Sequence, residues 1–207
     1  DIRASTLDPV DARGLPVPDV ATGIVKWLIP DFWPQKDEKS ILFLDELTNA
    51  SPAVQTALLQ LVLDRKLGNY IMPADCVVIA AGNRVQDKSG SVKLISSMRS
   101  RFLQLDFDVE LGDWCDWAIE SNQAESVISF LRWRPMHLLD FDPRERTSAN
   151  PRAWEMVSKL QQVGVMQELE YEVFSGLVGE GAASEYTGFL RIYQDLPDVA
   201  EILADPI

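Results

Sequence analysis

Two short apolar runs, at residues 41–44 and 76–81, stand out from the polar sequence around them. No polar side chain interrupts either run, a pattern typical of strands buried on both faces of a parallel sheet. Between them, Ser51 and Pro52 supply an N-cap and a first-turn proline, and apolar residues follow at helical spacing. We therefore predict a helix over residues 52–64. Two parallel strands joined by a helix form a βαβ unit.

Shorter elements are predicted around this unit. Residues 1–35 are rich in Pro, Gly and Asp, which indicates an irregular segment that contains a hairpin. Residues 66–74 turn back at a Gly-Asn pair and predict a second hairpin. Residues 92–99 predict a short helix, and the alternation over residues 102–107 predicts a third strand.

The C-terminal half has a helical pattern. The predicted helices span residues 111–119, 124–131, 151–163, 168–178, 184–193 and 199–203. A polar, proline-containing stretch at residues 140–148 separates the second of these helices from the third. We therefore predict an α/β core over residues 1–140 and a small all-α domain over residues 141–207.

Composition and charge exclude several classes of protein. The 207 residues are 46% hydrophobic, enough for a packed core. The net charge of −13 argues against broad contact with a phosphate backbone, so we expect no nucleic-acid partner. No apolar run is long enough to span a membrane. The two cysteines do not suggest a disulfide framework, and we expect a cytoplasmic protein.

The chain begins with Asp1-Ile2-Arg3, without a Met and without the pattern of a signal peptide. We expect the natural protein to contain further sequence upstream of Asp1.

Two adjacent acids, Asp45 and Glu46, follow the first apolar strand. Ligands collect at the carboxyl ends of parallel strands. An Asp there can hold Mg²⁺ directly or through water, and a neighbouring Glu can orient a nucleophilic water molecule. Taken alone, the same pattern also fits a strand that is followed by a helix-capping acid.

Three further features carry candidate chemistry. Asn83 ends the second strand in Ala-Gly-Asn, which taken alone is also an ordinary turn. Arg99 and Arg101 precede the predicted third strand, where arginines either face solvent or neutralise a phosphoryl group on a neighbouring subunit. Arg152 lies in the first turn of a helix, where a cation opposes the helix dipole, and this suggests a functional reason for it.

The order of these features resembles the AAA+ ATPases over nearly the whole chain, and more narrowly the MoxR-like family. The resemblance implies that residues 42–46 are similar to Walker B, with Asp45 beside Mg²⁺ and Glu46 polarising water. It implies that Asn83 corresponds to sensor 1, Arg101 to the arginine finger with Arg99 as the second choice, and Arg152 to sensor 2 in a helical lid. ATP and Mg²⁺ are the implied cofactors.

One motif of these ATPases is missing. No G-x-x-x-x-G-K-[ST] loop occurs in the sequence, although the family places it upstream of the segment that begins here at Asp1. Without its N–H groups and its Lys, we expect this chain alone to bind ATP poorly or not at all and to be inactive. Truncation explains this better than degeneration, since the catalytic residues remain.

Two alternatives to the ATPase were weighed. A P-loop-free, non-catalytic subunit of a ring would keep Arg101 for a neighbour's nucleotide. A carboxylate-metal nuclease that uses Asp45 and Glu46 would need more clustered acids and a basic surface for its substrate.

The resemblance also implies the partners. MoxR-like proteins form rings, so we expect a homo-oligomer, a hexamer by analogy, that remodels a protein client. The client suggested by the family is a protein with a von Willebrand factor A domain. The hairpins expected within residues 1–35 and 66–74 are similar to inserts of this family, and by that resemblance both would face the pore or the client.

Overall fold

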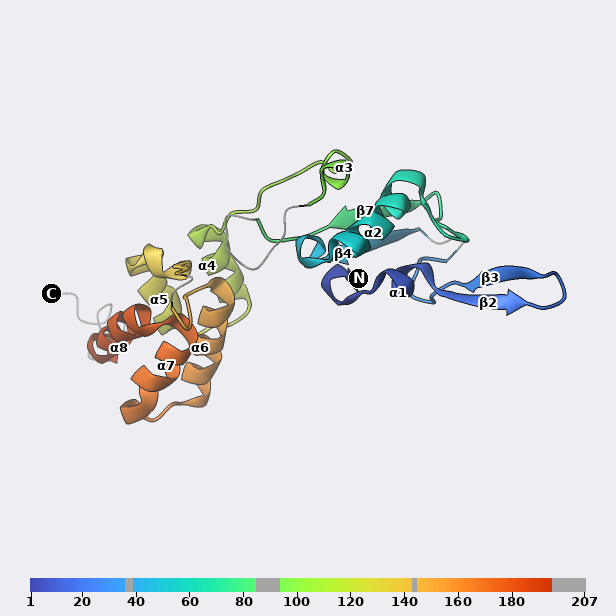
Figure 1. The fold of residues 1–207 in the computed structure, drawn as a ribbon. Helices are drawn as coiled ribbons and strands as arrows, with labels where there is room; N and C mark the ends of the chain where they lie inside the picture. The colour runs from blue at the N-terminus through green and yellow to red at the C-terminus, as the bar shows by residue number, and fades with distance from the viewer. Residues whose placement is uncertain (36–38, 85–93, 143–144, 195–207) are drawn as a thin grey trace. The chain divides into compact units, whose positions relative to one another are not determined.

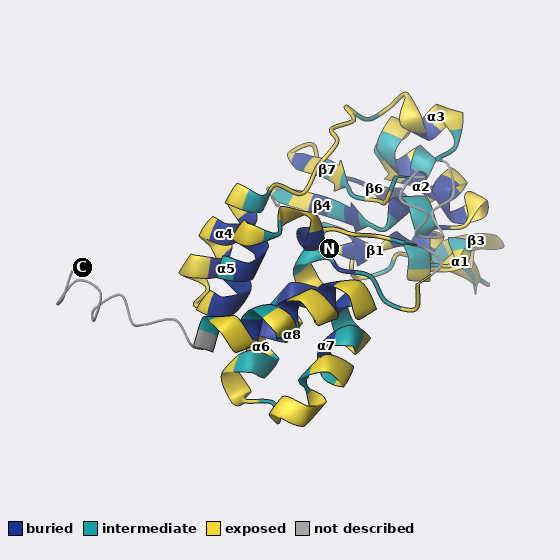
Figure 2. Cartoon of the chain, turned by 90° about the vertical axis from the view of Figure 1, so that its left-hand side faces the viewer, coloured by how far each residue is buried: buried dark blue, intermediate teal, exposed yellow. Residues whose placement is uncertain are grey.

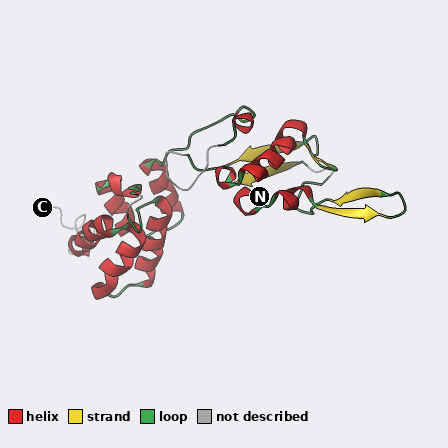
Figure 3. Ribbon diagram, in the orientation of Figure 1, coloured by secondary structure: helices red, strands yellow, loops and turns green. Residues whose placement is uncertain are grey.

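The computed structural model describes residues 1–35, 39–84, 94–142 and 145–194. The chain divides into two compact units, Asp1–Leu105 and Asp106–Ile207. All the named strands lie in the first unit, and the described part of the second unit is built from helices (Figure 3). This is the predicted order, an α/β core followed by a helical region.

A three-stranded parallel sheet forms the centre of the first unit (Figure 1). Its strands are β1 (Ile2–Arg3), β4 (Ser40–Asp45) and β7 (Cys76–Ala80), in that order across the sheet. Helix α2 (Pro52–Asp64) connects β4 to β7, and the Ser51 side chain caps it by accepting a hydrogen bond from the Val54 N–H. The predicted helix and both predicted core strands are confirmed.

Short elements and two hairpins complete the first unit. One hairpin pairs β2 (Leu15–Asp19) with β3 (Ile24–Leu28), and the other pairs β5 (Lys66–Leu67) with β6 (Tyr70–Ile71). Both hairpins were predicted. The other helices among the described residues of this unit are η1 (Ala4–Thr6), α1 (Pro9–Arg13), η2 (Leu47–Asn49) and α3 (Ser96–Arg99). Residues 92 and 93 of the predicted helix over 92–99 lie outside the described residues.

Only one face of the sheet is buried. Leu42 and Leu44 pack into a core with Leu58 and Leu61 of α2, whereas Ile41 on the opposite face of β4 is 64% exposed. Val77 and Ile79 of β7 are exposed as well. The prediction that these strands are buried on both faces is therefore wrong for the described residues, because α2 covers one face and no described element covers Ile41.

The predicted third strand over residues 102–107 is also wrong. These residues belong to no strand, and Leu103 and Phe107 are 86% and 90% exposed. Their alternation has the period of a strand, but a strand also needs a neighbour for its N–H and C=O groups. In the described part of the chain no strand lies beside them.

In the described part of the second unit, five α-helices enclose the core. Phe130, Trp154 and Tyr186 are fully buried and in ring contact with one another, and the buried Phe174 contacts Tyr186. The helices turn their buried sides inward and leave an exposed outer side (Figure 2). They are α4 (Leu111–Glu120), α5 (Glu125–Trp133), α6 (Pro151–Val163), α7 (Glu170–Val178) and α8 (Glu180–Gln194), joined in places by η4 (Pro135–Leu138) and η5 (Gln167–Leu169).

Most helix bounds follow the predictions, and one does not. Helix α6 spans the predicted residues, and Gly164 and Gly179 end α6 and α7 with positive φ angles, as C-cap glycines do. Helix α8 starts four residues before the predicted Ser184, because Gly181 continues the helix instead of breaking it. The short helix predicted over residues 199–203 lies outside the described residues.

Along the chain, the boundary between the two compact units falls between Leu105 and Asp106, whereas the domain boundary was predicted after residue 140. Helices α4 and α5 share one hydrophobic core with α6, α7 and α8, which places them in the second compact unit. Compactness is a different criterion from domain identity, so the assignment of residues 1–140 and 141–207 to two domains stays a prediction.

The burial of α2 gives a testable contrast between two leucines of one helix. Leu58 is 0% exposed and Leu63 is 48% exposed. We expect Leu58→Ala to lower the free energy of unfolding of the first unit by about 2–5 kcal/mol, because it leaves a cavity. The matched control Leu63→Ala should cost less than about 1 kcal/mol. Urea unfolding followed by circular dichroism measures both, and equal losses would contradict the observed inner face of α2.

Candidate functional site

The two candidate acids lie where β4 ends. Asp45 is the last residue of β4, in register with Arg3 of β1, and Glu46 follows directly. Leu42 and Leu44 alternate into the core and fix the strand, so Asp45 and Glu46 emerge at its carboxyl end, each partly buried. Parallel sheets present ligand-binding groups at this edge.

Glu46 has an unusual backbone conformation. Its φ of 52° and ψ of 35° are left-handed, which costs a residue with a side chain on the order of 1 kcal/mol or more. Two hydrogen bonds hold the turn: the Glu46 N–H donates to Asp45 Oδ1 at 2.8 Å, and the Leu47 N–H donates to the Ala81 carbonyl at 2.9 Å. The bend that directs the Glu46 side chain is therefore held by the Asp45 carboxylate and by the segment that follows β7.

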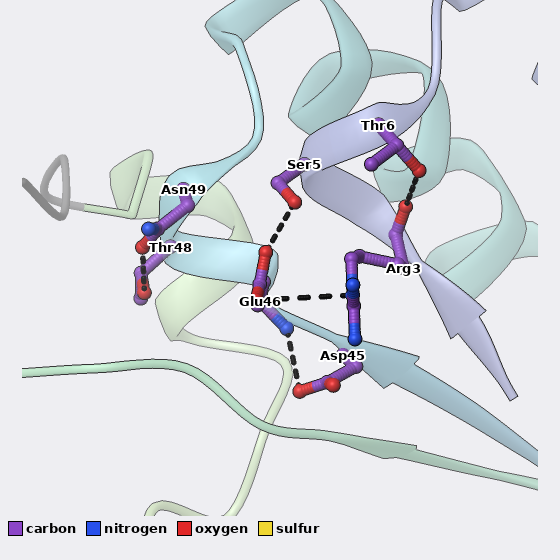
Figure 4. Close-up of polar contacts among 7 residues, drawn as sticks. All are labelled: Arg3, Ser5, Thr6, Asp45, Glu46, Thr48 and Asn49. Atoms are coloured by element: carbon purple, nitrogen blue, oxygen red, sulfur yellow. Dashed lines mark hydrogen bonds and ion pairs between the residues drawn. The ribbon is translucent and has the colours of Figure 1, made fainter.

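The carboxylate of Glu46 is contacted from the first residues of the chain. The Ser5 hydroxyl donates a hydrogen bond to Oε2, and Arg3 Nε lies 3.8 Å from Oε1 (Figure 4). The ion pair is partly open to solvent and contributes less than about 1 kcal/mol. Its structural effect is that both oxygens of Glu46 are engaged on the side of β1.

No pattern in the sequence points to Ser5 or Arg3. Their position follows from the pairing of β1 with β4, in which Arg3 stands beside Asp45. Strand β1 is two residues long, too short for any hydrophobic period to reveal it. A two-residue strand can be located only through its neighbour.

The predicted neighbour of the acids, Asn83, lies just beyond β7. Strands β4 and β7 are adjacent and parallel, with Leu44 in register with Ala80. The Ala81 N–H donates to the Leu44 carbonyl at 2.9 Å, which extends the pairing past the end of β7. Gly82 and Asn83 follow, and Asn83 is exposed. The expectation that the two strands are neighbours is confirmed, and their polar ends share one sheet edge.

Gly82 approaches Thr48 closely. A methyl group added at Gly82 would lie 2.6 Å from Thr48 Oγ1 and 2.8 Å from its Cγ2. These distances are well inside van der Waals contact, so the position accepts no side chain while Thr48 keeps its conformation. The turn after β7 can thus pack directly on the segment that follows Glu46.

Arg99 and Arg101 lie at the end of α3 in the same compact unit as the acids. Both side chains are exposed, and neither forms an ion pair with a described residue. Helix α3 is anchored by the buried Met98 and by a hydrogen bond from the Ile95 N–H to Gln55 Oε1 of α2 at 3.0 Å. The arginines therefore extend from a fixed support, although they make no contact with Asp45 or Glu46.

Arg152 belongs to the second unit, where it lies in the first turn of α6. Asn150 caps this helix by accepting a hydrogen bond from the Ala153 N–H at 3.0 Å, and Pro151 occupies the first turn. Arg152 is exposed. The predicted helix start is confirmed, and the role of Arg152 in nucleotide binding stays a prediction.

The donors at the sheet edge suit Mg²⁺ and a water molecule, but they do not form a complete nucleotide site. Mg²⁺ on a nucleotide takes one or two carboxylates from the protein, and Asp45 offers one. In the described ranges no three His, Cys, Asp or Glu side chains come together as a metal cluster. The backbone loop that would hold the β- and γ-phosphates is absent from the 207 residues.

Comparison with known protein families found a match within the first unit. Residues 14–102, fewer than half of the chain, match the AAA domain (dynein-related subfamily). The matched stretch contains Asp45, Glu46, Asn83, Arg99 and Arg101 and ends before Arg152. No curated protein matches the chain.

The parallel sheet with its helices, followed by the helical region, fits an α/β AAA+ core, and the match supports an AAA+ ATPase in general. AAA proteins typically use ATP with Mg²⁺ and commonly form oligomeric rings. No helix in the described part of the chain is both long enough and apolar enough to cross a membrane.

The contact between Gly82 and Thr48 can be tested by a double-mutant cycle. We expect Gly82→Ala to lower the free energy of unfolding by about 1–3 kcal/mol, because the new methyl group overlaps Thr48. Adding Thr48→Ala removes both contacting atoms and should recover most of the loss. Chemical unfolding of the single and double variants gives the coupling energy, and strictly additive losses would show that the two turns do not touch.

Proposed function

We propose that this chain is the major part of a MoxR-like AAA+ ATPase that hydrolyses ATP with Mg²⁺ to remodel protein partners. The observation that carries the proposal is the adjacency of β4 and β7, with Asp45 and Glu46 at the end of one strand and Asn83 just beyond the other. The match to the AAA domain over residues 14–102 supports it.

Each residue has a separate task in this proposal. The Asp45 carboxylate holds the Mg²⁺, directly or through a water molecule. The Glu46 carboxylate orients the attacking water and takes up its proton. The metal, when bound, neutralises charge on the transferring phosphoryl group. Asn83 contributes a neutral amide at the same sheet edge, which can hold water or a phosphate oxygen without adding negative charge.

The two oxygens of Glu46 differ in how strongly they are already bound. Its Oε2 accepts the Ser5 hydroxyl, and its Oε1 faces Arg3 at 3.8 Å. A carboxylate has about four acceptor sites, so both oxygens keep room for a water molecule. The contact of Oε1 with Arg3 is long and partly exposed, so Oε1 is the oxygen that binds a water molecule more readily.

The arginines complete the proposal. Arg101, or less favourably Arg99, acts as the arginine finger that reaches a nucleotide on a neighbouring subunit, and Arg152 acts as sensor 2 from the helical lid. Both arginines are exposed, as a residue that works on another subunit requires; Arg99 ends the anchored helix α3, and Arg101 lies in the turn that follows it. Residues 1–140 form the core of this arrangement and residues 141–207 the lid.

The assembly proposed is a cytoplasmic homo-oligomeric ring, a hexamer by analogy. Its client is a protein. The resemblance to MoxR-like ATPases suggests a protein with a von Willebrand factor A domain as the candidate client. These points rest on the resemblance and on the AAA match, and not on a contact in this chain.

A second candidate is a ring subunit that binds a neighbour's nucleotide and does not hydrolyse its own. The observation that favours it is the missing G-x-x-x-x-G-K-[ST] loop. Both candidates expect the 207-residue chain alone to be inactive. They differ for the product of the complete gene, which hydrolyses ATP under the first candidate and does not under the second. ATP binding and turnover of the two proteins, measured together, separate them.

Glu46→Gln tests the assignment of the catalytic acid in the active protein. We expect ATP binding to be kept and turnover to fall about a hundredfold or more, because the amide cannot accept the proton of the attacking water. Glu120→Gln, an exposed acid on α4, is the matched control and should leave turnover unchanged. Undiminished hydrolysis by the Glu46 variant would show that the Walker B assignment is wrong.

Arg101→Ala tests the proposed arginine finger. We expect turnover to fall about a thousandfold in a ring made only of the variant. Mixing it with Glu46→Gln subunits, which keep their arginine but cannot hydrolyse, should restore part of the activity. Arg99→Ala is the control and should lose less. Failure of the mixture to recover would argue against a role on the neighbouring subunit.

A further inference from the structure

The β2–β3 hairpin is a separate two-stranded sheet within the first unit. Its five residue pairs run from Leu15 with Leu28 to Asp19 with Ile24, and no other described strand joins it. It extends past α1, away from the sheet that carries the acids (Figure 1). An isolated hairpin of this size has little stability of its own in water, so additional pairing or packing would stabilise it.

Two prolines close one edge of this hairpin. In an antiparallel pair the N–H and C=O groups of one residue point to the same side, and they alternate along the strand. Proline has no N–H, so the bonds from β2 to β3 must come from Leu15, Val17 and Asp19. Pro16 and Pro18 then face the outer edge of β2, which offers no donor there. A further strand cannot pair along that edge.

The outer edge of β3 is open by the same reasoning. Ile24, Lys26 and Leu28 are in register with Asp19, Val17 and Leu15, and their backbone groups are used within the hairpin. The N–H and C=O groups of Val25 and Trp27 point the other way. Since the sheet ends at β3 among the described residues, these groups form a short row of free donors and acceptors.

Apolar side chains lie beside this open edge. Leu15, Ile24, Val25 and Leu28 are all more than half exposed, and Val20 in the turn is 93% exposed. At the base of the hairpin an apolar groove of about 510 Å³ is lined in part by Leu7, Val10, Leu15, Leu28, Ile29 and Phe32. A concentration of apolar surface of this kind marks an interaction site.

The charge of the hairpin and its base is acidic. Asp11 is the charged residue that lines the groove, and residues 7–32 together contain four acids and two bases, namely Asp8, Asp11, Asp19, Asp31, Arg13 and Lys26. Lys26 is already neutralised by Asp19, since its Nζ lies 2.5 Å from Oδ2. The surface therefore favours an occupant with positive charge next to its apolar residues.

We propose that the outer edge of β3 binds an extended, apolar segment of a partner protein that is flanked by basic residues. The segment adds a third strand through the backbone of Val25 and Trp27 and places an apolar side chain in the groove beside Leu28. This inference goes beyond the proposed ATPase activity and does not depend on it. It is an instance of strand addition, in which the main chain supplies affinity and alternate side chains supply selectivity.

A second copy of the chain fits this edge less well. The two-fold register that pairs Val25 with Trp27 of the second copy uses all the open groups. It also brings together two copies of residues 7–32, which carry the same net acidic charge, and juxtaposed like charges are unfavourable. A basic segment from another protein avoids this arrangement if its lysines lie beyond the ends of β3.

The test uses a defined probe, a short acetylated peptide of alternating valine and threonine with lysines at both ends. Hydrogen exchange followed by NMR reports on single amides of the 207-residue chain. We expect the peptide to slow exchange at the Val25 and Trp27 amides, because only those two point outward. The Lys26 amide should be protected with and without the peptide, which shows that the hairpin itself is intact.

Two variants separate backbone pairing from side-chain contact. Val25→Pro removes one outward N–H and should weaken peptide binding roughly three- to tenfold. Val25→Thr keeps the N–H, changes only the side chain, and is the matched control that should bind almost as well as the natural chain. A peptide N-methylated at the positions facing β3 should not bind.

Three results would overturn the proposal. One is the absence of slowed exchange at Val25 and Trp27 even at millimolar peptide. Another is equal binding of the N-methylated peptide, which would mean apolar adhesion without strand pairing. The third is a dimer of the chain in sedimentation that Val25→Pro makes monomeric, which would identify a second copy as the occupant.

Discussion

The parallel pairing of β4 with β7 is the constraint on which the site depends. It aligns Leu44 with Ala80, and two further hydrogen bonds continue it beyond the strands, from Ala81 to Leu44 and from Leu47 to Ala81. These bonds tie the segment after β4 to the segment after β7. Both bonds join backbone atoms only. They therefore position the segments that carry the acids and Asn83 and leave the side chains of these residues out of the pairing. The close approach of Gly82 to Thr48 completes the same junction.

The left-handed conformation of Glu46 is a second consequence of this junction. A glutamate in this region is strained, and such strain persists where surrounding bonds determine the backbone. Here the Asp45 side chain and the Ala81 carbonyl hold the residues on either side of the bend. The bend turns Glu46 toward β1, where Ser5 and Arg3 contact its carboxylate. The orientation of the proposed catalytic acid is thus set by three strands of the sheet.

The sequence predicted the features that depend on local chemistry and missed those that depend on distant neighbours. Helix α2 was predicted because Ser51 and Pro52 are local start signals, and α6 because Asn150 and Pro151 are. The apolar runs located β4 and β7, but the prediction that both faces of these strands are buried was wrong. An uninterrupted apolar run does not show whether other elements cover both faces. Residues 102–107 have the period of a strand but no described strand to pair with.

Ser5 and Arg3 were missed because β1 is defined only by its pairing with β4. For the candidate site, sequence order indicated which residues to consider, and the sheet showed which of them share an edge.

The charge of the chain explains why the support of Arg99 and Arg101 matters. There are 32 acidic residues against 19 Lys and Arg, so a protein of this composition repels a polyanion such as a nucleotide unless its cations are held where they are needed. An exposed arginine on a flexible loop would lose side-chain and backbone entropy on reaching a phosphate, whereas one on a fixed helix loses less. Met98 in the core and the bond between Ile95 and Gln55 fix α3 on α2. Arg99 and Arg101 therefore belong to the same compact unit as Asp45 and Glu46, and the packing of α3 on α2 links the arginines to the helix that follows the acids.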